Sequence, residues 1–223
     1  MNFKTLTLYS AHIDEQCQFY NEVLGFILLE KDSTHFAVRV GKTVLRFVYR
    51  EEVEIDHFAF NIPSNQEKEA LNWLKERLNV LPYDGDELID FPNWNAKTMY
   101  FYDADGNILE FIARKNLQEN QQIPFSIDSV LEVSEIGLPT GNLKEIYHCI
   151  GEQFPIPIYS GSLEQFCALG NERGLLIVVD KNSKKWLPND EVANPAPFNL
   201  TVTLDKKTFD FVYKNERLIV KRV

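Results

Sequence analysis

The sequence has few cysteines and none of the short motifs that mark the commonest catalytic and nucleotide-binding sites. Only three cysteines occur among the 223 residues, and no two of them are spaced as C-x-x-C. An odd set without that spacing argues against a disulfide framework and against a thiolate zinc site. The G-x-G-x-x-G and Walker patterns and the usual serine and cysteine nucleophile motifs are absent as well. No organic cofactor is therefore expected, and the cysteines are predicted to be buried structural thiols.

Basic residues and long apolar runs are also scarce. Lys and Arg number 23 against 33 Asp and Glu, which gives a formal net charge of -10 and a pI near 4.9. Nucleic acids and anionic membranes attract basic surfaces, so neither is expected as a partner. No run is long enough to cross a bilayer, and Met1–Ser10 lacks the apolar core of a signal peptide. We expect a cytoplasmic protein.

Hydrophobic residues make up 44% of the chain, which is enough for one large core or two small ones. The spacing of these residues repeats along the chain. In the first copy, an alternating strand precedes a helix whose apolar residues recur every three or four positions. Asp14 is a suitable N-cap for this helix and Gly25 a suitable C-cap. The predicted order is strand 3–9, helix 14–24 and strands 26–31, 35–40 and 43–49.

The same order then recurs with a period of roughly 50 to 60 residues, which is a repeat signal. The second copy has a helix opened by a capping box at Ser64–Glu67. Its strands are predicted at 55–62, 80–83, 88–91, 98–102 and 107–113. Because one sheet with a single helix leaves an apolar face uncovered, such copies are expected to pack in pairs.

The second half of the chain repeats the order less completely. A third copy covers 130–179, and a truncated fourth copy has the strand 198–204, a short helix or turn, and the strand 217–223. The segment between the halves is polar, rich in amides and shows neither period. We therefore predict two domains, residues 1–115 and 128–223, joined by a linker at 116–127.

Two titratable residues lie inside strand-like runs. His57 falls in the run IDHFAF, and Glu110 falls in the run NILEFI. An ionisable side chain in such a strand is unexpected unless something holds it. This pair is the clearest sequence sign of a functional site.

Three segments resemble the vicinal oxygen chelate superfamily, which includes glyoxalase I, bleomycin-resistance proteins, methylmalonyl-CoA epimerase and extradiol dioxygenases. The helix at 14–26 resembles the family's first-helix signature, the strand around His57 its ligand-bearing strand, and residues 102–111 its closing hairpin. The resemblance implies an α+β fold of paired βαβββ modules that form a cup-shaped mixed sheet around a pocket, with a second, truncated pair of modules. It also implies, in many members, a divalent metal that binds two neighbouring oxygens of the substrate.

In the family, the metal ligands come from the first and last strands of both modules, which correspond here to Thr5, Arg46, His57 and Glu110. Imidazole and carboxylate suit Mn, Fe, Co, Ni or Zn, whereas a guanidinium repels a cation. One hypothesis is a metal held by His57 and Glu110 and completed by water or substrate. The other is a metal-free pocket in which Arg46 pairs with Glu110 in place of the metal. The sequence leaves both open.

Four residues are predicted to contact a substrate in the pocket of the first domain. Thr5 and Arg46 occupy the two remaining ligand positions of the resemblance. Asn61 lies on the strand that carries His57, and Trp94 lies in a loop rich in Pro and Asn, where a large aromatic side chain is a good candidate for a pocket rim.

The second pair of modules offers fewer ligands. Its first strands carry Glu135 and Asn199 at the corresponding positions, and its last strand, near Ile219, has no carboxylate. The two-histidine, one-carboxylate set of iron-dependent ring cleavage is therefore absent there. We expect a supporting or dimerising role for this half, and a homodimer is left open.

These observations favour two functions. The first is a glyoxalase-like, metal-dependent enzyme acting on a small oxygen-rich or aromatic metabolite, with Glu110 as a metal ligand or as the base that moves a proton next to a carbonyl. The second is a metal-free, bleomycin-resistance-like protein that binds a small molecule. In both cases the expected partner is a small-molecule ligand.

Overall fold

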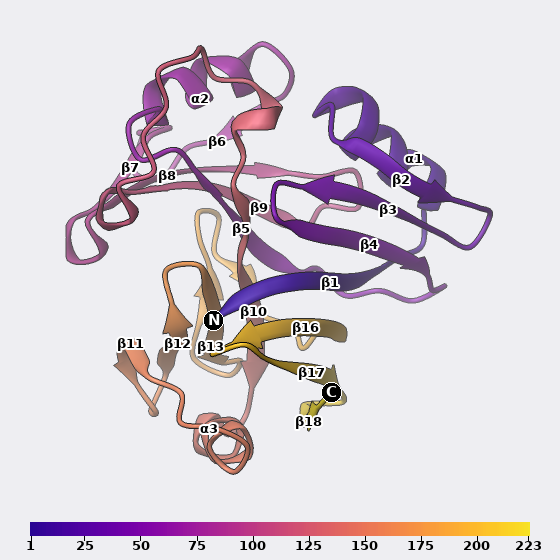
Figure 1. Cartoon of the computed structure of the whole chain (residues 1–223), viewed down its shortest axis with the longest axis vertical. Coiled ribbons are helices and arrows are strands. Elements are labelled where there is room, and N and C mark those ends of the chain that lie inside the picture. Colours follow the sequence, from indigo (N-terminus) through magenta and orange to yellow (C-terminus); the bar gives the residue numbers. More distant parts are fainter.

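The computed structural model describes residues 1–223 and contains two large mixed β-sheets (Figure 1). The seven-stranded sheet has the order β18-β17-β16-β1-β4-β3-β2. Its strands are β1 (Asn2–Ser10), β2 (Ile27–Lys31), β3 (His35–Val40), β4 (Thr43–Tyr49), β16 (Phe198–Leu204), β17 (Lys207–Lys214) and β18 (Arg217–Arg222).

The nine-stranded sheet has the order β11-β12-β13-β10-β5-β9-β8-β6, and β7 also pairs with β8. Its strands are β5 (His57–Ile62), β6 (Val80–Leu81), β7 (Ile89–Phe91), β8 (Ala96–Tyr102), β9 (Ile108–Arg114), β10 (Glu132–Thr140), β11 (Ile158–Ser162), β12 (Phe166–Asn171) and β13 (Gly174–Asp180). A small hairpin of β14 (Lys185–Trp186) and β15 (Glu191–Val192) follows.

The helices are short. They are α1 (Ile13–Gln18), continued by a π-helical turn at Phe19–Val23, then α2 (Glu67–Lys75) and α3 (Leu143–Gly151), with 3₁₀ turns at Pro92–Trp94, Lys115–Leu117 and Ile127–Ser129. Figure 1 shows α1 and α2 at one end of the molecule and α3 at the other. None of these helices has the length and the apolar character that crossing a membrane would require.

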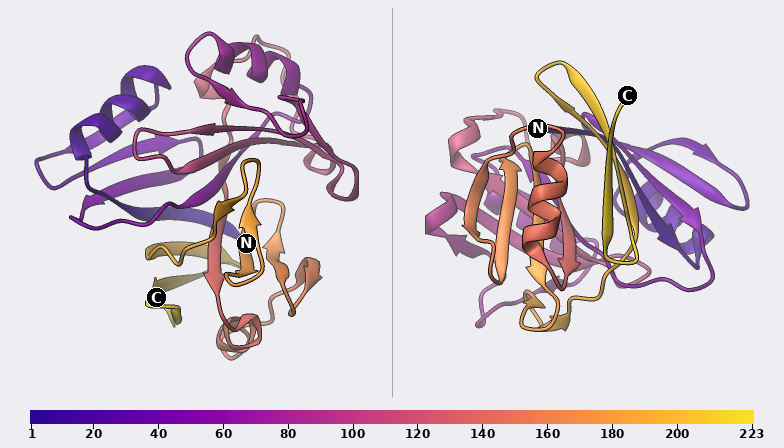
Figure 2. Two further views of the ribbon diagram at one scale, coloured as in Figure 1. Left: turned by 180° about the vertical axis from the view of Figure 1, so that it is seen from behind. Right: turned by 90° about the horizontal axis from the view of Figure 1, so that it is seen from below.

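The modules pair in a way that differs from the prediction. The first strand of module one, β1, pairs with β16 of module four, and β5 of module two pairs with β10 of module three, both antiparallel. Figure 2 shows β16 to β18 (yellow) beside β1 (indigo). Modules one and two therefore do not share a cup. The reason is that the first strand of each module is an open edge, so that the sequence of one module does not specify which other edge will cover it.

The fold class is the predicted one, an α+β arrangement of paired modules in mixed sheets. One element was predicted wrongly: residues 207–214, expected as a helix or turn, form strand β17. Its buried residues alternate, Phe209, Phe211 and Tyr213, which is the period of a strand. The division into two domains joined at 116–127 stays a prediction about which residues fold as a unit. In the structure, strands from before and after that segment pair with each other.

Strands β5, β9 and β10 at the centre of the nine-stranded sheet are buried on both faces. On one face, Phe58, Phe60 and Phe111 join the main hydrophobic core, which includes residues of both sheets. The other face carries polar side chains covered by aromatic residues and by the β14–β15 hairpin. A strand buried on both faces reads as a continuous apolar run, so that polar residues within it stand out.

A β-bulge in β10 decides which side chains reach this second face. The pairing of β10 with β5 shifts between Val133 and Glu135, so that Ser134 is the extra residue. In an unbroken strand, Val133 and Glu135 would share one face. The bulge instead leaves Val133 in the main core and turns Glu135 to the second face.

Candidate metal centre

Three titratable side chains converge on the second face of the nine-stranded sheet. Glu110 on β9 and Glu135 on β10 both lie opposite Ala59, the central residue of β5 between them. His57 precedes Ala59 by two positions, so it lies on the same face. Because the Ala59 side chain is a single methyl group, the two carboxylates have room above it. One donor atom from each of His57, Glu110 and Glu135 lies within 4.8 Å of the other two.

His57 is held in one tautomer. Its Nδ1 lies 3.0 Å from the carbonyl oxygen of Ile108, so Nδ1 carries the proton and donates it to that oxygen. The other ring nitrogen, Nε2, keeps its lone pair and lies 3.7 Å from Oε2 of Glu110. Burial lowers the pKa of His57, which keeps the ring neutral. A neutral imidazole with its second nitrogen tied to the backbone is the usual state of a metal-binding histidine.

Glu110 is anchored by one of its two oxygens. The hydroxyl of Thr98 donates to Oε1 at 2.6 Å, which leaves Oε2 directed toward His57. Burial raises the pKa of Glu110, because the charged form loses its hydration. The carboxylate is thereby fixed in place and made a better proton acceptor.

Glu135 is paired with a buried cation. Its Oε1 accepts a hydrogen bond from Nη2 of Arg114, whose side chain is fully buried. Burial raises the pKa of Glu135 to about 7 even though Arg114 acts in the opposite direction. The two carboxylates therefore differ in their surroundings, one beside a hydroxyl and one beside a guanidinium.

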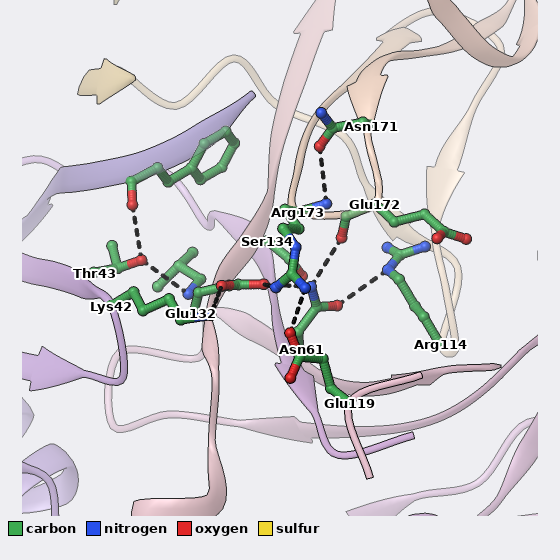
Figure 3. A network of polar contacts seen from close by, with 12 residues as sticks. Lys42, Thr43, Asn61, Arg114, Glu119, Glu132, Ser134, Asn171, Glu172 and Arg173 are labelled. Atoms are coloured by element: carbon green, nitrogen blue, oxygen red, sulfur yellow. Dashed lines mark hydrogen bonds and ion pairs between the residues drawn. The ribbon is translucent and has the colours of Figure 1, made fainter. Parts of the chain in front are cut away.

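Arg114 belongs to a network of polar contacts that extends away from the three converging residues (Figure 3). Its Nε donates to Oδ1 of Asn61 at 3.1 Å, and the amide of Asn61 donates to Glu132 at 3.1 Å and to the carbonyl oxygen of Glu172 at 2.8 Å. Arg173 in turn pairs with Glu132 at 3.2 Å. The network joins β5, β9, β10 and the β12–β13 turn around the buried guanidinium.

A cavity of about 510 Å³ opens over the converging residues. Five aromatic side chains contribute to its wall: Phe91, Trp94, Tyr100, Phe166 and Trp186. The β14–β15 hairpin covers one side, where the Trp186 ring lies 4.9 Å from the His57 ring. A deep, mostly apolar pocket with a few converging polar groups is typical of small-molecule sites.

Comparison with known proteins supports the fold over the whole chain. No protein-family model matches the sequence. Metallothiol transferase FosB from Staphylococcus haemolyticus is 29% identical over 113 residues, which are 47% of this chain and 78% of that protein. A candidate dioxygenase from Bacillus subtilis subsp. subtilis str. 168 aligns over 100% of this chain and 84% of its own, with a TM-score of 0.65 and 12% identity. A glyoxalase I mutant from Zea mays aligns over 99% and 93%, with a TM-score of 0.61 and 11% identity. The chain has the vicinal oxygen chelate fold.

Within the vicinal oxygen chelate fold, the strand pairing identifies four equivalent positions around this cavity. Ala59 lies opposite Glu110 across the parallel pair β5–β9, and Gly137 lies opposite Ile177 across the parallel pair β10–β13. Residues two positions before Ala59 and Gly137 are His57 and Glu135, so the four positions hold His57, Glu110, Glu135 and Ile177. Ile177 has no donor atom, so three of the four positions carry a side chain that could bind a metal.

These three residues fit a divalent metal ion by the chemistry of their donors. One imidazole nitrogen and two carboxylates form a set that suits Mn, Fe, Co, Ni or Zn. The tautomer of His57 and the direction of Glu110 Oε2 toward His57 agree with this role. Glu135 reaches Arg114 through Oε1, so its other oxygen is the one available to a metal.

The predicted site residues are separated by the structure into two groups. His57, Glu110 and Trp94 line the cavity. Asn61 lies on the same sheet but is fully buried in the Arg114 network, outside the cavity wall. Thr5 lies on β1 of the other sheet, opposite Val44 and Thr201, and does not line the cavity.

The predicted pair between Arg46 and Glu110 does not form. Arg46 lies on β4 of the seven-stranded sheet, at a half-exposed position, and pairs with Glu30 of β2, the second strand along from β4. The prediction placed it at the cavity because it assumed that modules one and two face each other. The pairing of modules two and three brings Arg114 and Glu135 to the cavity instead.

Sequence reasoning undervalued the second half of the chain. It set Glu135 aside as part of a supporting module, although the same signal that marks His57, a titratable residue inside an apolar strand, is present in the run VSEIGL. Arg114 carries that signal too, at the end of the run NILEFIAR. No pattern in the sequence identifies Trp186, because its place over His57 depends on how the hairpin folds back.

Proposed function

We propose that the chain is a metal-dependent enzyme that acts on a small oxygen-rich or aromatic metabolite in the cavity over β5, β9 and β10. The observation that carries this proposal is the convergence of His57 Nε2 with carboxylate oxygens of Glu110 and Glu135, three buried donors within 4.8 Å of one another. Buried ionisable groups of this kind are rare in a core without a function.

The three residues would hold a divalent ion, which when bound polarises an oxygen of the substrate as a Lewis acid. In the alternative role, Glu110 is not a metal ligand but the base that moves a proton next to a carbonyl. Its Oε1 is held by Thr98, its Oε2 is directed toward His57, and burial raises its pKa toward the range in which a carboxylate accepts protons well.

The walls of the cavity suit an aromatic or otherwise planar substrate. Trp94 packs edge to face on Tyr159, with ring centroids 5.1 Å apart, and its Nε1 donates to Ser160 at 3.2 Å, so this wall is fixed. Trp186 contributes a second aromatic ring to the wall, packed against His57. Rigid aromatic walls bind planar groups at little entropic cost and exclude water from the reacting atoms.

A second candidate is a metal-free small-molecule-binding protein. The ion pair between Arg114 and Glu135 favours it, because a buried guanidinium already neutralises one of the three donors. In this case the cavity would bind its ligand without chemistry.

Metal content separates the two candidates. We expect the full chain, purified without chelator or affinity-tag metal, to contain close to one divalent transition-metal ion per molecule by plasma mass spectrometry. The His57→Ala variant should lose that ion, since its only nitrogen donor is gone. His35→Ala is the matched control, because His35 lies on β3 of the other sheet and should leave the metal content unchanged.

Absence of metal from the native chain, even after each of the five ions is added back, would contradict the enzyme proposal and favour the binding protein. Equal metal content in the native chain and in His57→Ala would place the metal elsewhere.

A further inference from the structure

The two carboxylates of the site need a counter-charge to stay together. Glu110 and Glu135 both lie opposite Ala59 and are more than nine-tenths buried, so their negative charges repel each other in a region with little water. The strand pairing fixes their backbones, but the side chain of Glu135 would be free to turn away. Something must hold it near His57.

Arg114 holds Glu135 from a rigid position. It lies on β9 four residues after Glu110, and even spacing in a strand puts both side chains on one face. Its guanidinium is fixed on three sides: Nη2 bonds Glu135, Nε bonds Asn61 at 3.1 Å, and the Trp94 ring lies 5.3 Å from its central carbon. A planar guanidinium with such contacts sets both the place and the direction of its acceptor.

One nitrogen of this guanidinium has no partner. Nη1 of Arg114 is buried and makes no hydrogen bond. An unsatisfied buried donor costs free energy, and such costs are found at functional sites more than in cores that only have to be stable. The position of the Arg114 side chain thus allows its contact with Glu135 but leaves one of its own donors without a hydrogen bond.

We propose that Arg114 is the positioning residue of the site, which holds the Glu135 carboxylate toward His57 and Glu110 so that the three-donor set exists before any metal arrives. This inference rests on the proposed function. It gives the network of Figure 3 a role as well, because Asn61 and, through it, Glu132 and the β12–β13 turn keep the guanidinium in place.

The test uses Co²⁺ as a probe on the full chain, with affinity measured by titration calorimetry and ligand geometry by the visible absorption of the bound ion. Arg114→Met should bind Co²⁺ about 10 to 100 times more weakly, as is usual when a group that orients a ligand is lost, and its spectrum should change. Arg114→Lys should recover part of the affinity, because a lysine keeps the charge but cannot bond Glu135 and Asn61 in one plane.

Arg39→Met is the matched control. It removes an exposed arginine on β3 of the seven-stranded sheet, outside the network of Figure 3, so affinity and spectrum should stay as in the native chain. Native affinity and spectrum in folded Arg114→Met would overturn the proposal. Should Arg114→Met fail to fold, a native spectrum and affinity in Arg114→Lys would overturn it equally.

If the proposed metal-dependent function is wrong, the Co²⁺ titration gives a different result. A native chain that binds no Co²⁺ contradicts the metal site, and the positioning role is then decided by crystal structures of the metal-free native chain and Arg114→Lys. Displacement of the Glu135 carboxylate from His57 and Glu110 in the variant supports the role of Arg114. An unmoved carboxylate contradicts it.

Discussion

Single hydrogen bonds set the chemistry of several buried residues in this molecule. The bond from His57 to the Ile108 carbonyl leaves Nε2 as an acceptor, and Ile108 itself is tied back to the backbone of Asp56. Asn107 continues this chain of contacts, since its side chain accepts from the Asp56 amide and donates to Asp103. The surroundings of the candidate metal centre thus reach a further buried carboxylate, that of Asp103.

Asp103 ties α1 to the turn before β9. It accepts hydrogen bonds from Gln16, from the Tyr20 hydroxyl at 2.9 Å and from both the backbone and the side chain of Asn107 at 2.9 Å. Burial nevertheless raises the pKa of Asp103 to about 6, from 3.8 in the exposed state. The folded protein therefore holds this proton more tightly than the unfolded chain does.

This difference predicts a pH-dependent loss of stability. The protonated Asp103 contributes about 3 kcal/mol to the free energy of unfolding. This contribution is fully present below about pH 4 and is lost as the pH rises through about 6. We expect Asp103→Asn to lack this part of the pH dependence. Urea denaturation at pH 4.5 and pH 7 measures it, with Asp180→Asn as a control, because hydrogen bonds lower the pKa of Asp180. Equal pH dependence in Asp103→Asn and the native chain would contradict the prediction.

Among the secondary-structure elements, the β14–β15 hairpin covers a side of the cavity that the strands of the nine-stranded sheet leave open. Trp186 is its inner residue and packs on His57, while Glu191 accepts a hydrogen bond from the Tyr102 hydroxyl at 3.0 Å. The ring of Trp186 also lies against Gly137 of β10, where the absence of a side chain lets it approach. The Trp186 ring and the Tyr102 hydroxyl thus both help to hold the hairpin in place.

Replacing Gly137 tests this packing. A Cβ at this position would lie 2.7 Å from the Trp186 ring, so Gly137→Ala should push the ring away from His57. We expect a loss of about 1 to 3 kcal/mol in the free energy of unfolding, as for other overpacked cores, together with faster proteolysis of the hairpin. Gly151→Ala, where a Cβ meets nothing within 4 Å, is the control. An unchanged cleavage rate in Gly137→Ala would show that the hairpin does not depend on this contact.

At the scale of the whole molecule, both sheets are built from strands that lie far apart in the sequence. The seven-stranded sheet joins β1 to β16, and the nine-stranded sheet joins β5 to β10. The site follows from the second junction, because His57 and Glu110 come from module two and Glu135 comes from module three. Neither half of the chain contains the complete set of donors.

This arrangement predicts that the halves depend on each other. Residues 1–115 alone would expose the edges of β1 and β5, and unpaired apolar edges favour aggregation. We expect this fragment and the fragment 116–223 to be poorly folded when expressed separately and to form a complex when expressed together. Circular dichroism and size-exclusion chromatography measure both results. A cooperative unfolding transition in 1–115 alone would support two independent domains.

Much of the local structure could be predicted from the sequence, because it depends on local periodicity. The helices near residues 14, 67 and 143 and most strands follow from alternating or three-to-four spacing, and β17 was missed because its strand pattern begins directly after a turn. His57 and Glu110 could be selected as site residues, since a titratable side chain in an apolar run stands out in any fold.

The module, its order of elements and two of the three converging donors can be predicted from the sequence, because they depend on neighbours along the chain. The tertiary structure alone decided which modules pair, and with it the third donor, Glu135, its cation, Arg114, and the separation of Arg46 from the cavity. The physical reason is that open strand edges of similar modules are nearly interchangeable locally. The choice between them is made by the packing of the whole core, to which both sheets contribute.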